Sequence, residues 1–130
     1  MNLTILNTDG HMMEQMVADL LRRSGFIIID QNYKVGHLEI DLIAMEGETL
    51  CFIEVKSRAK PIRLEEVDEI ISAKQREHIT TVADIFCRNT NRLQYKKVRF
   101  DYALVYVPQN EPPRVQYIRD AFTPTHPDLQ

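Results

Sequence analysis

The 130-residue sequence predicts an α/β fold in which helices flank a central mixed β-sheet. Apolar patterns follow one another in the order helix, three strands, helix, two strands. Hydrophobic residues make up 44% of the chain, enough for a single core, and no linker or repeat divides it. We therefore expect one domain over residues 1–122, followed by a loose tail over residues 123–130, which holds two prolines and no apolar run.

The first helix is predicted from apolar residues that recur at helical spacing between Met13 and Leu21. Thr8 or Asp9 would cap its start, and Gly25 would end it. Glu14 lies about 100° around the helix from Met13, at the edge of the apolar stripe. Two interpretations stay open for Glu14: a ligand that reaches into a cleft, or a solvated first-turn carboxylate favoured by the helix dipole.

Three strands follow, and the last two form a hairpin. Residues 26–35 begin with four apolar side chains, which predicts a buried strand of a sheet with helices packed on it. Residues 38–45 and 50–57 flank a turn at Gly47. With a two-residue loop at Gly47-Glu48, the numbers of paired residues sum to 95.

This register places four charged side chains on one face of the hairpin. Asp41 lies opposite Glu54, and Glu39 lies opposite Lys56. A loop longer by one residue would put Asp41 and Glu54 on opposite faces.

Two adjacent carboxylates repel each other unless a cation lies between them. Their oxygen atoms suit Mg²⁺ or Mn²⁺, which points to phosphodiester cleavage with Lys56 orienting the attacking water. The alternative is an ordinary set of cross-strand ion pairs on a solvated face. Apolar residues predicted on the same face count against that alternative; they are Ile43, Leu50 and Phe52. We expect Glu39 to hold Lys56 in place rather than to bind metal.

The second helix is predicted to begin near Ser72, with a buried stripe between Ile79 and Phe86. Gln75 falls on the inward side and is a candidate supporting residue, but Ser72 and Gln75 also form a capping-box pattern, which we favour. Residues 98–107 and 114–118 are predicted as a strand and an edge strand. Asp101, in the first of these, is interpreted as structural.

Four segments carry a resemblance to a known family. In chain order, they resemble the motifs of the YraN-like family of the PD-(D/E)xK, or restriction-endonuclease-like, nuclease superfamily; the segments are residues 38–44, 52–58, 99–101 and 120–122. The similarity spans residues 10–122. The chain departs from the family pattern at Leu38 and Met13, where glycine is usual or frequent, and neither change removes a ligand.

The resemblance implies a metal-dependent nuclease with a restriction-endonuclease-like sandwich fold. It implies catalytic roles for Asp41, Glu54 and Lys56, with Mg²⁺ or Mn²⁺ held by Asp41, Glu54 and Glu14. Lys74 matches a basic position of the family on the second helix.

The net charge of −3 is atypical of a DNA-binding domain, but the charge is unevenly distributed. Residues 1–54 carry a net charge of −6, residues 55–99 carry +5, and residues 100–130 carry −2. The predicted contacts to nucleic acid are Arg58, Lys60 and Lys74. We expect this binding to be weak and strongly sensitive to salt unless the protein oligomerises.

No apolar run is long enough for a membrane helix, and the first residues lack the features of a signal peptide, so we expect a cytoplasmic protein. The leading hypothesis is a Mg²⁺- or Mn²⁺-dependent endonuclease that hydrolyses DNA, with branched or damaged DNA as candidate substrates. It would act as a monomer or weak homodimer. The main alternative is a non-catalytic nucleic-acid or protein-binding module on the same fold. A weaker one is an RNA-directed or exonucleolytic enzyme.

Overall fold

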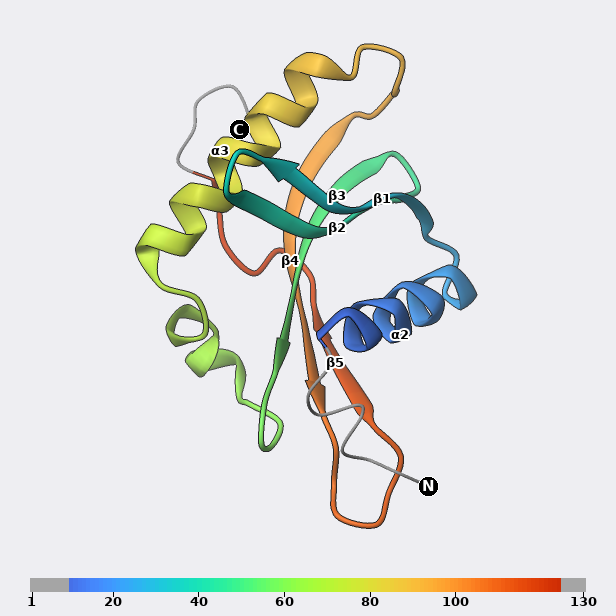
Figure 1. Ribbon diagram of the computed structural model, residues 1–130, viewed down its shortest axis with the longest axis vertical. Coiled ribbons are helices and arrows are strands. Elements are labelled where there is room, and N and C mark those ends of the chain that lie inside the picture. The colour runs from blue at the N-terminus through green and yellow to red at the C-terminus, as the bar shows by residue number, and fades with distance from the viewer. Residues whose placement is uncertain (1–9, 125–130) are drawn as a thin grey trace.

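The computed structural model describes residues 10–124 as a twisted five-stranded sheet between two helices (Figure 1). The element order is the predicted one. The elements are α2 (Gly10–Arg23), β1 (Ile27–Val35), β2 (Leu38–Glu46), β3 (Thr49–Ser57), the short 3₁₀ helix η1 (Leu64–Glu69), α3 (Ala73–Asn89), β4 (Lys97–Tyr106) and β5 (Arg114–Ile118). The predicted cap at Thr8 or Asp9 and most of the predicted tail lie outside the described residues.

The sheet is mixed, with the spatial order β1-β2-β3-β4-β5. Strands β1, β2 and β3 pair antiparallel, β3 and β4 pair parallel, and β5 returns antiparallel along β4. A parallel pair requires a crossover connection, which η1 and α3 supply between β3 and β4. The mixed sheet and the edge position of β5 are both confirmed.

The two faces of the sheet are covered by different helices, because side chains alternate along each strand. Ile43 and Phe52 belong to the core cluster that contains Phe86 of α3. Ala44 and Ile53, one residue further on, belong to the cluster that contains Val17 of α2. Figure 1 shows α2 and α3 on opposite sides of the sheet.

Strand β1 differs from the prediction of a buried strand, because it forms the outer edge of the sheet. Ile27 is 64% exposed, whereas Phe26 just before it is buried and packs edge-on against Tyr117. The register with β2 shifts between Ile28 and Asp30, so the apolar run at the start of the strand spans a bulge. Ile28 packs against the core cluster that contains Val17 of α2, and Ile29 packs against the cluster that contains Phe86 of α3, so both faces of the run are partly covered while the outer edge of the strand stays unpaired.

The hairpin register is confirmed for the five pairs nearest the turn. They run from Glu46 opposite Thr49 to Leu42 opposite Ile53, and each pair sums to 95. Gly47 has φ = 60°, which is the left-handed conformation that the predicted turn requires. Regular pairing ends at Leu42 and Ile53, so the next pair away from the turn, Asp41 and Glu54, lies just beyond the ladder.

The predicted cap of α3 is also confirmed. The Ser72 hydroxyl accepts the Gln75 N–H at 3.1 Å, and the Gln75 side chain accepts the Ser72 N–H at 3.1 Å. This reciprocal pair fixes where α3 begins and therefore how its first turn faces the sheet.

Asp101 is structural, as interpreted from the sequence. Its carboxylate is buried and accepts hydrogen bonds from the Arg99 guanidinium at 2.8 and 2.9 Å, the Tyr117 hydroxyl at 2.5 Å and the Asp120 N–H at 2.9 Å. The network ties β4 to β5 and to the turn that follows β5.

Candidate functional site

The site lies where the antiparallel ladder between β2 and β3 opens at Asp41. One carboxylate oxygen of Asp41 accepts the backbone N–H of Val55 at 2.8 Å, in place of a main-chain carbonyl. The alternation of β2 also breaks here. Ile40 and Leu42 are two positions apart, so they would face the same side of a regular strand. Instead, Ile40 belongs to the core cluster on the α3 side of the sheet, and Leu42 belongs to the cluster on the α2 side. This local break turns the Asp41 side chain into the space between the strands.

Strand β1 is irregular at the same level. Asn32 has φ = 55°, and it lies across from Asp41 at an interruption in the pairing of β1 with β2, between the pairs Gln31–Leu42 and Tyr33–Ile40. Asparagine tolerates the left-handed region better than most residues. Two irregular strands therefore meet at the site, as is common where a sheet carries function.

A pocket of about 430 Å³ forms at this point and gathers charged residues from three elements. Helix α2 supplies Glu14, β2 supplies Glu39 and Asp41, and β3 supplies Glu54 and Lys56. One oxygen atom from each of Glu14, Glu39 and Asp41 lies within 4.8 Å of the other two. All five predicted residues therefore line one pocket, although they are up to 42 positions apart in the sequence.

Asn32 is the residue of the site that sequence reasoning missed. Its side-chain amide donates to Glu14 at 2.6 Å and to Glu39 at 2.9 Å. It thus links α2 to β2 and holds two carboxylates toward each other. The only sequence signal was an asparagine inside a strand pattern, a residue that favours irregular backbone.

Glu39 and Lys56 do not form the predicted ion pair. Glu39 pairs instead with Lys34 at 3.8 Å on β1, because β2 stays paired with β1 after it has separated from β3. The charge of Lys56 acts on Glu54, where it favours the ionised carboxylate and so works to lower the Glu54 pKa. The predicted face also differs in its apolar part, because Ile43, Leu50 and Phe52 lie in the α3 cluster and do not line the pocket.

The electrostatics of the pocket favour protonated carboxyl groups. Burial, and then the neighbouring Glu54 carboxyl, raise the pKa of Asp41 from 3.8 to about 8. Burial raises the pKa of Glu14 from 4.5 to about 7, with Asp41 adding to the effect and the Asn32 amide opposing it. Burial also raises the pKa of Glu54. Without a cation, the cluster therefore retains protons near neutral pH.

The other predicted residues lie outside this pocket. Gln75 is exposed and its side chain serves the α3 cap. Arg58 donates to the carbonyl oxygen of Ile70 at 3.1 Å and lines a groove of about 310 Å³ with Lys60. That groove also carries Glu66 and Glu69, so it is of mixed charge. Lys74 is exposed in the first turn of α3 and lines neither space.

The pocket combines hard oxygen donors with one ammonium group, which is the donor set that Mg²⁺ and Mn²⁺ prefer. The mixed sheet with a helix on each side has the architecture of a restriction-endonuclease-like sandwich, as predicted. In this protein, the carboxylates described above lie where the sheet opens between β2 and β3.

The chain belongs to the uncharacterised protein family UPF0102, whose model matches residues 13–105. This family, which includes the YraN-like proteins, belongs to the restriction-endonuclease-like superfamily. The chain is 33% identical to a UPF0102 protein of Dictyoglomus turgidum, over 87% of this chain and 95% of the relative. It is 36% identical to a UPF0102 protein of Chlorobium chlorochromatii, over 87% and 89% of the two chains. The predicted resemblance is confirmed.

None of the helices within residues 10–124 has the length and apolar character needed to cross a membrane.

Proposed function

We propose that this protein is a Mg²⁺- or Mn²⁺-dependent endonuclease that hydrolyses DNA phosphodiester bonds in the cytoplasm. The observation that carries the proposal is the convergence of Glu14, Asp41, Glu54 and Lys56, from three separate elements, in one pocket. Branched and damaged DNA are the candidate substrates.

In the proposed mechanism, Glu14 and Asp41 would hold the cation together with Glu54 of the same pocket, and Glu39, which has an oxygen within 4.8 Å of oxygens of Glu14 and Asp41, would add a further ligand. The bound ion would polarise the phosphoryl oxygens and lower the pKa of a coordinated water. The hydrogen bond from Val55 fixes one oxygen of Asp41, and the Asn32 amide fixes Glu14 and Glu39. These contacts orient the carboxylates, which would release the protons that they hold when they bind a cation.

Lys56 supplies the positive charge on the β3 side of the pocket. Its ammonium would orient the attacking water or neutralise charge that develops on the scissile phosphate. This role is supported by the position of Lys56 in the same pocket as Glu54 and by its charge, which works to lower the Glu54 pKa.

Cleavage assays test the proposal directly. Supercoiled plasmid, a four-way junction and a nicked duplex would be incubated with Mg²⁺, with Mn²⁺ or with a chelator. We expect metal-dependent cleavage that is lost in Asp41→Ala and reduced about a hundredfold or more in Lys56→Gln. Lys97→Gln is the matched control, because Lys97 is exposed at the start of β4 and does not line the pocket. The proposal fails if no substrate is cut with either metal, or if both pocket variants cut as well as the wild type.

The assays also separate the alternatives. A circular plasmid has no ends, so cutting of linear DNA alone would indicate an exonuclease, and cutting of RNA alone an RNA-directed enzyme. The non-catalytic alternative is favoured by the cations of residues 55–99, including Arg58 and Lys60 in their own groove. It predicts binding to nucleic acid without a divalent metal and without sensitivity to Glu54→Ala. Analytical ultracentrifugation of the same samples would distinguish a monomer from a weak homodimer.

A further inference from the structure

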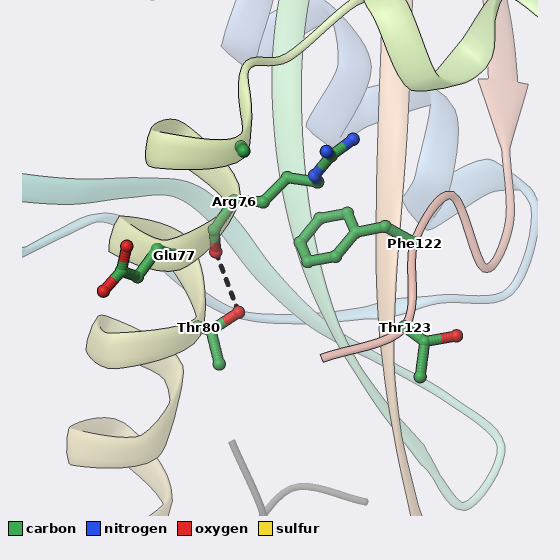
Figure 2. Close-up of a pocket in the computed structure, with 6 residues that line it drawn as sticks. Arg76, Glu77, Thr80, Phe122 and Thr123 are labelled. Atoms are coloured by element: carbon green, nitrogen blue, oxygen red, sulfur yellow. Dashed lines mark hydrogen bonds between the residues drawn. The ribbon is translucent and has the colours of Figure 1, made fainter. Parts of the chain in front are cut away.

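A second cavity lies between the first half of α3 and the segment after β5 (Figure 2). Its volume is about 320 Å³. None of its residues lines the pocket that contains Asp41 and Glu54. They are Ala73, Arg76, Glu77 and Thr80 of α3, together with Phe122 and Thr123.

Arg76 gives this cavity a positive charge. Its guanidinium reaches from α3 toward the Phe122 ring, whereas the Glu77 carboxylate points the other way (Figure 2). One guanidinium nitrogen donates to the carbonyl oxygen of Asp68 at a long 3.3 Å. No carboxylate in residues 10–124 forms an ion pair with Arg76, so most of its five N–H donors remain available to a ligand.

A buried tyrosine, Tyr102, lies next to two of the lining residues, Arg76 and Phe122. It is 1% exposed, and its hydroxyl is the buried side-chain polar atom without a hydrogen-bond partner in the described part of the chain. The Tyr102 ring lies 5.8 Å from the Phe122 ring, and Arg76 is the side chain that approaches the Tyr102 hydroxyl: its charge and its N–H groups oppose the rise in the Tyr102 pKa that burial causes. Tyr102 does not itself line the cavity, and its hydroxyl lies next to Arg76, so it favours the position of the guanidinium at the cavity.

The start of α3 adds to the positive potential. Ala73, the first residue of this 17-residue helix, lines the cavity, and the amino end of a helix dipole favours anions.

We propose that this cavity binds a nucleoside monophosphate unit, with the phosphate on Arg76 and the base against Phe122. The volume falls in the range of small-molecule sites and exceeds what inorganic phosphate alone would fill. An aromatic ring beside a guanidinium offers a surface on which any base stacks. The inference goes beyond the proposed endonuclease, because this binding requires neither a divalent metal nor cleavage.

The test is a titration of the full chain in the presence of a chelator. The probes are 2′-deoxyadenosine 5′-monophosphate, inorganic phosphate and 2′-deoxyadenosine, followed by calorimetry and by backbone amide shifts. We expect the monophosphate to bind at least about tenfold more tightly than phosphate, and the nucleoside more weakly than either. Shift changes are expected at Ala73, Arg76 and Thr123.

Variants assign the contacts. Arg76→Gln should weaken binding of the monophosphate about ten- to a hundredfold, since a charge-assisted bond to phosphate is lost. Phe122→Leu should weaken binding of the monophosphate but leave binding of phosphate unchanged. Arg114→Gln removes one exposed positive charge on β5 and is the matched control, with unchanged binding expected. If Arg76→Gln does not fold, Arg76→Lys retains the charge and should weaken binding less than tenfold.

Three results would overturn the proposal: no binding of the monophosphate, equal affinity for the monophosphate and phosphate, or shift changes centred on Glu54 and Val55. Asp41→Ala should bind the monophosphate as the wild type does, so failure of the endonuclease proposal is distinguishable from failure of this one. An oligonucleotide with a 5′-phosphate tests the source of the ligand. Tighter binding than the mononucleotide would identify a strand end, and equal binding would identify a free nucleotide.

Discussion

Replacing Asp41 with asparagine should make the metal-free protein more stable at neutral pH. Asp41→Asn removes a carboxylate whose ionisation is opposed by burial and by Glu54. Asp41 accepts the Val55 N–H at 2.8 Å, and the side-chain oxygen of an asparagine can occupy the same position and accept the same hydrogen bond. The substitution therefore removes the charge while retaining the contact that holds β2 to β3 at the site.

The size of the effect follows from the pKa of Asp41, which rises from 3.8 to about 8 on folding. The folded state then binds a proton that the unfolded state has released, so stability falls as pH rises from about 4 toward 8. At pH 7, the gain in the free energy of unfolding caused by Asp41→Asn has an upper limit of about 4 kcal/mol, because each pKa unit corresponds to about 1.4 kcal/mol. Because solvent reaches the pocket, we expect about 1–2 kcal/mol. For a domain of this size, that raises Tm by about 3–8 °C.

The assay is urea unfolding at several pH values between 4 and 8, with a chelator or with Mn²⁺. The wild type should lose stability as pH rises when metal is absent, and Asp41→Asn should lose less. Mn²⁺ should restore the stability of the wild type at pH 8 and have a smaller effect on the variant, because the ion binds the folded state. Glu48→Gln, in the exposed turn where Glu48 pairs with Lys96, is the control and should stay within about 0.5 kcal/mol.

The reasoning is refuted if Asp41→Asn is less stable than the wild type without metal at pH 8. It is equally refuted if the two proteins show the same dependence of stability on pH. Either result would mean that Asp41 is ionised and stabilised in the metal-free protein.

Three further predictions concern residues that support the fold and the site. Asn32→Gly retains access to φ = 55° but removes the amide that bridges Glu14 and Glu39, and it should weaken Mn²⁺ binding about tenfold by calorimetry; unchanged affinity would remove Asn32 from the site. Ser72→Ala should lower the free energy of unfolding by about 1 kcal/mol in urea without changing DNA cleavage, and a loss of cleavage would contradict a capping role. Asp101→Asn should destabilise the protein by about 3 kcal/mol, opposite in sign to Asp41→Asn, because it leaves the Arg99 charge partly unpaired; a neutral result would contradict the network.

Much of the fold is encoded in local sequence patterns. The five confirmed pairs of the hairpin follow from the glycine turn at Gly47 and from period-two alternation, both of which are short-range signals. The α3 cap follows from two residues three positions apart. The edge position of β1 was not predicted, because an apolar run does not reveal whether another strand pairs on its outer side.

The site shows the same division. The sequence alone determined that Asp41, Glu54 and Lys56 share one neighbourhood, because a hairpin register fixes which residues lie across from each other. The tertiary structure decided the rest: the ladder opens at Asp41, Glu39 pairs with Lys34, and Asn32 joins α2 to β2. These contacts depend on a bulge, a left-handed residue and the packing of a helix against the sheet, which are set by burial and backbone sterics across distant segments rather than by any local pattern.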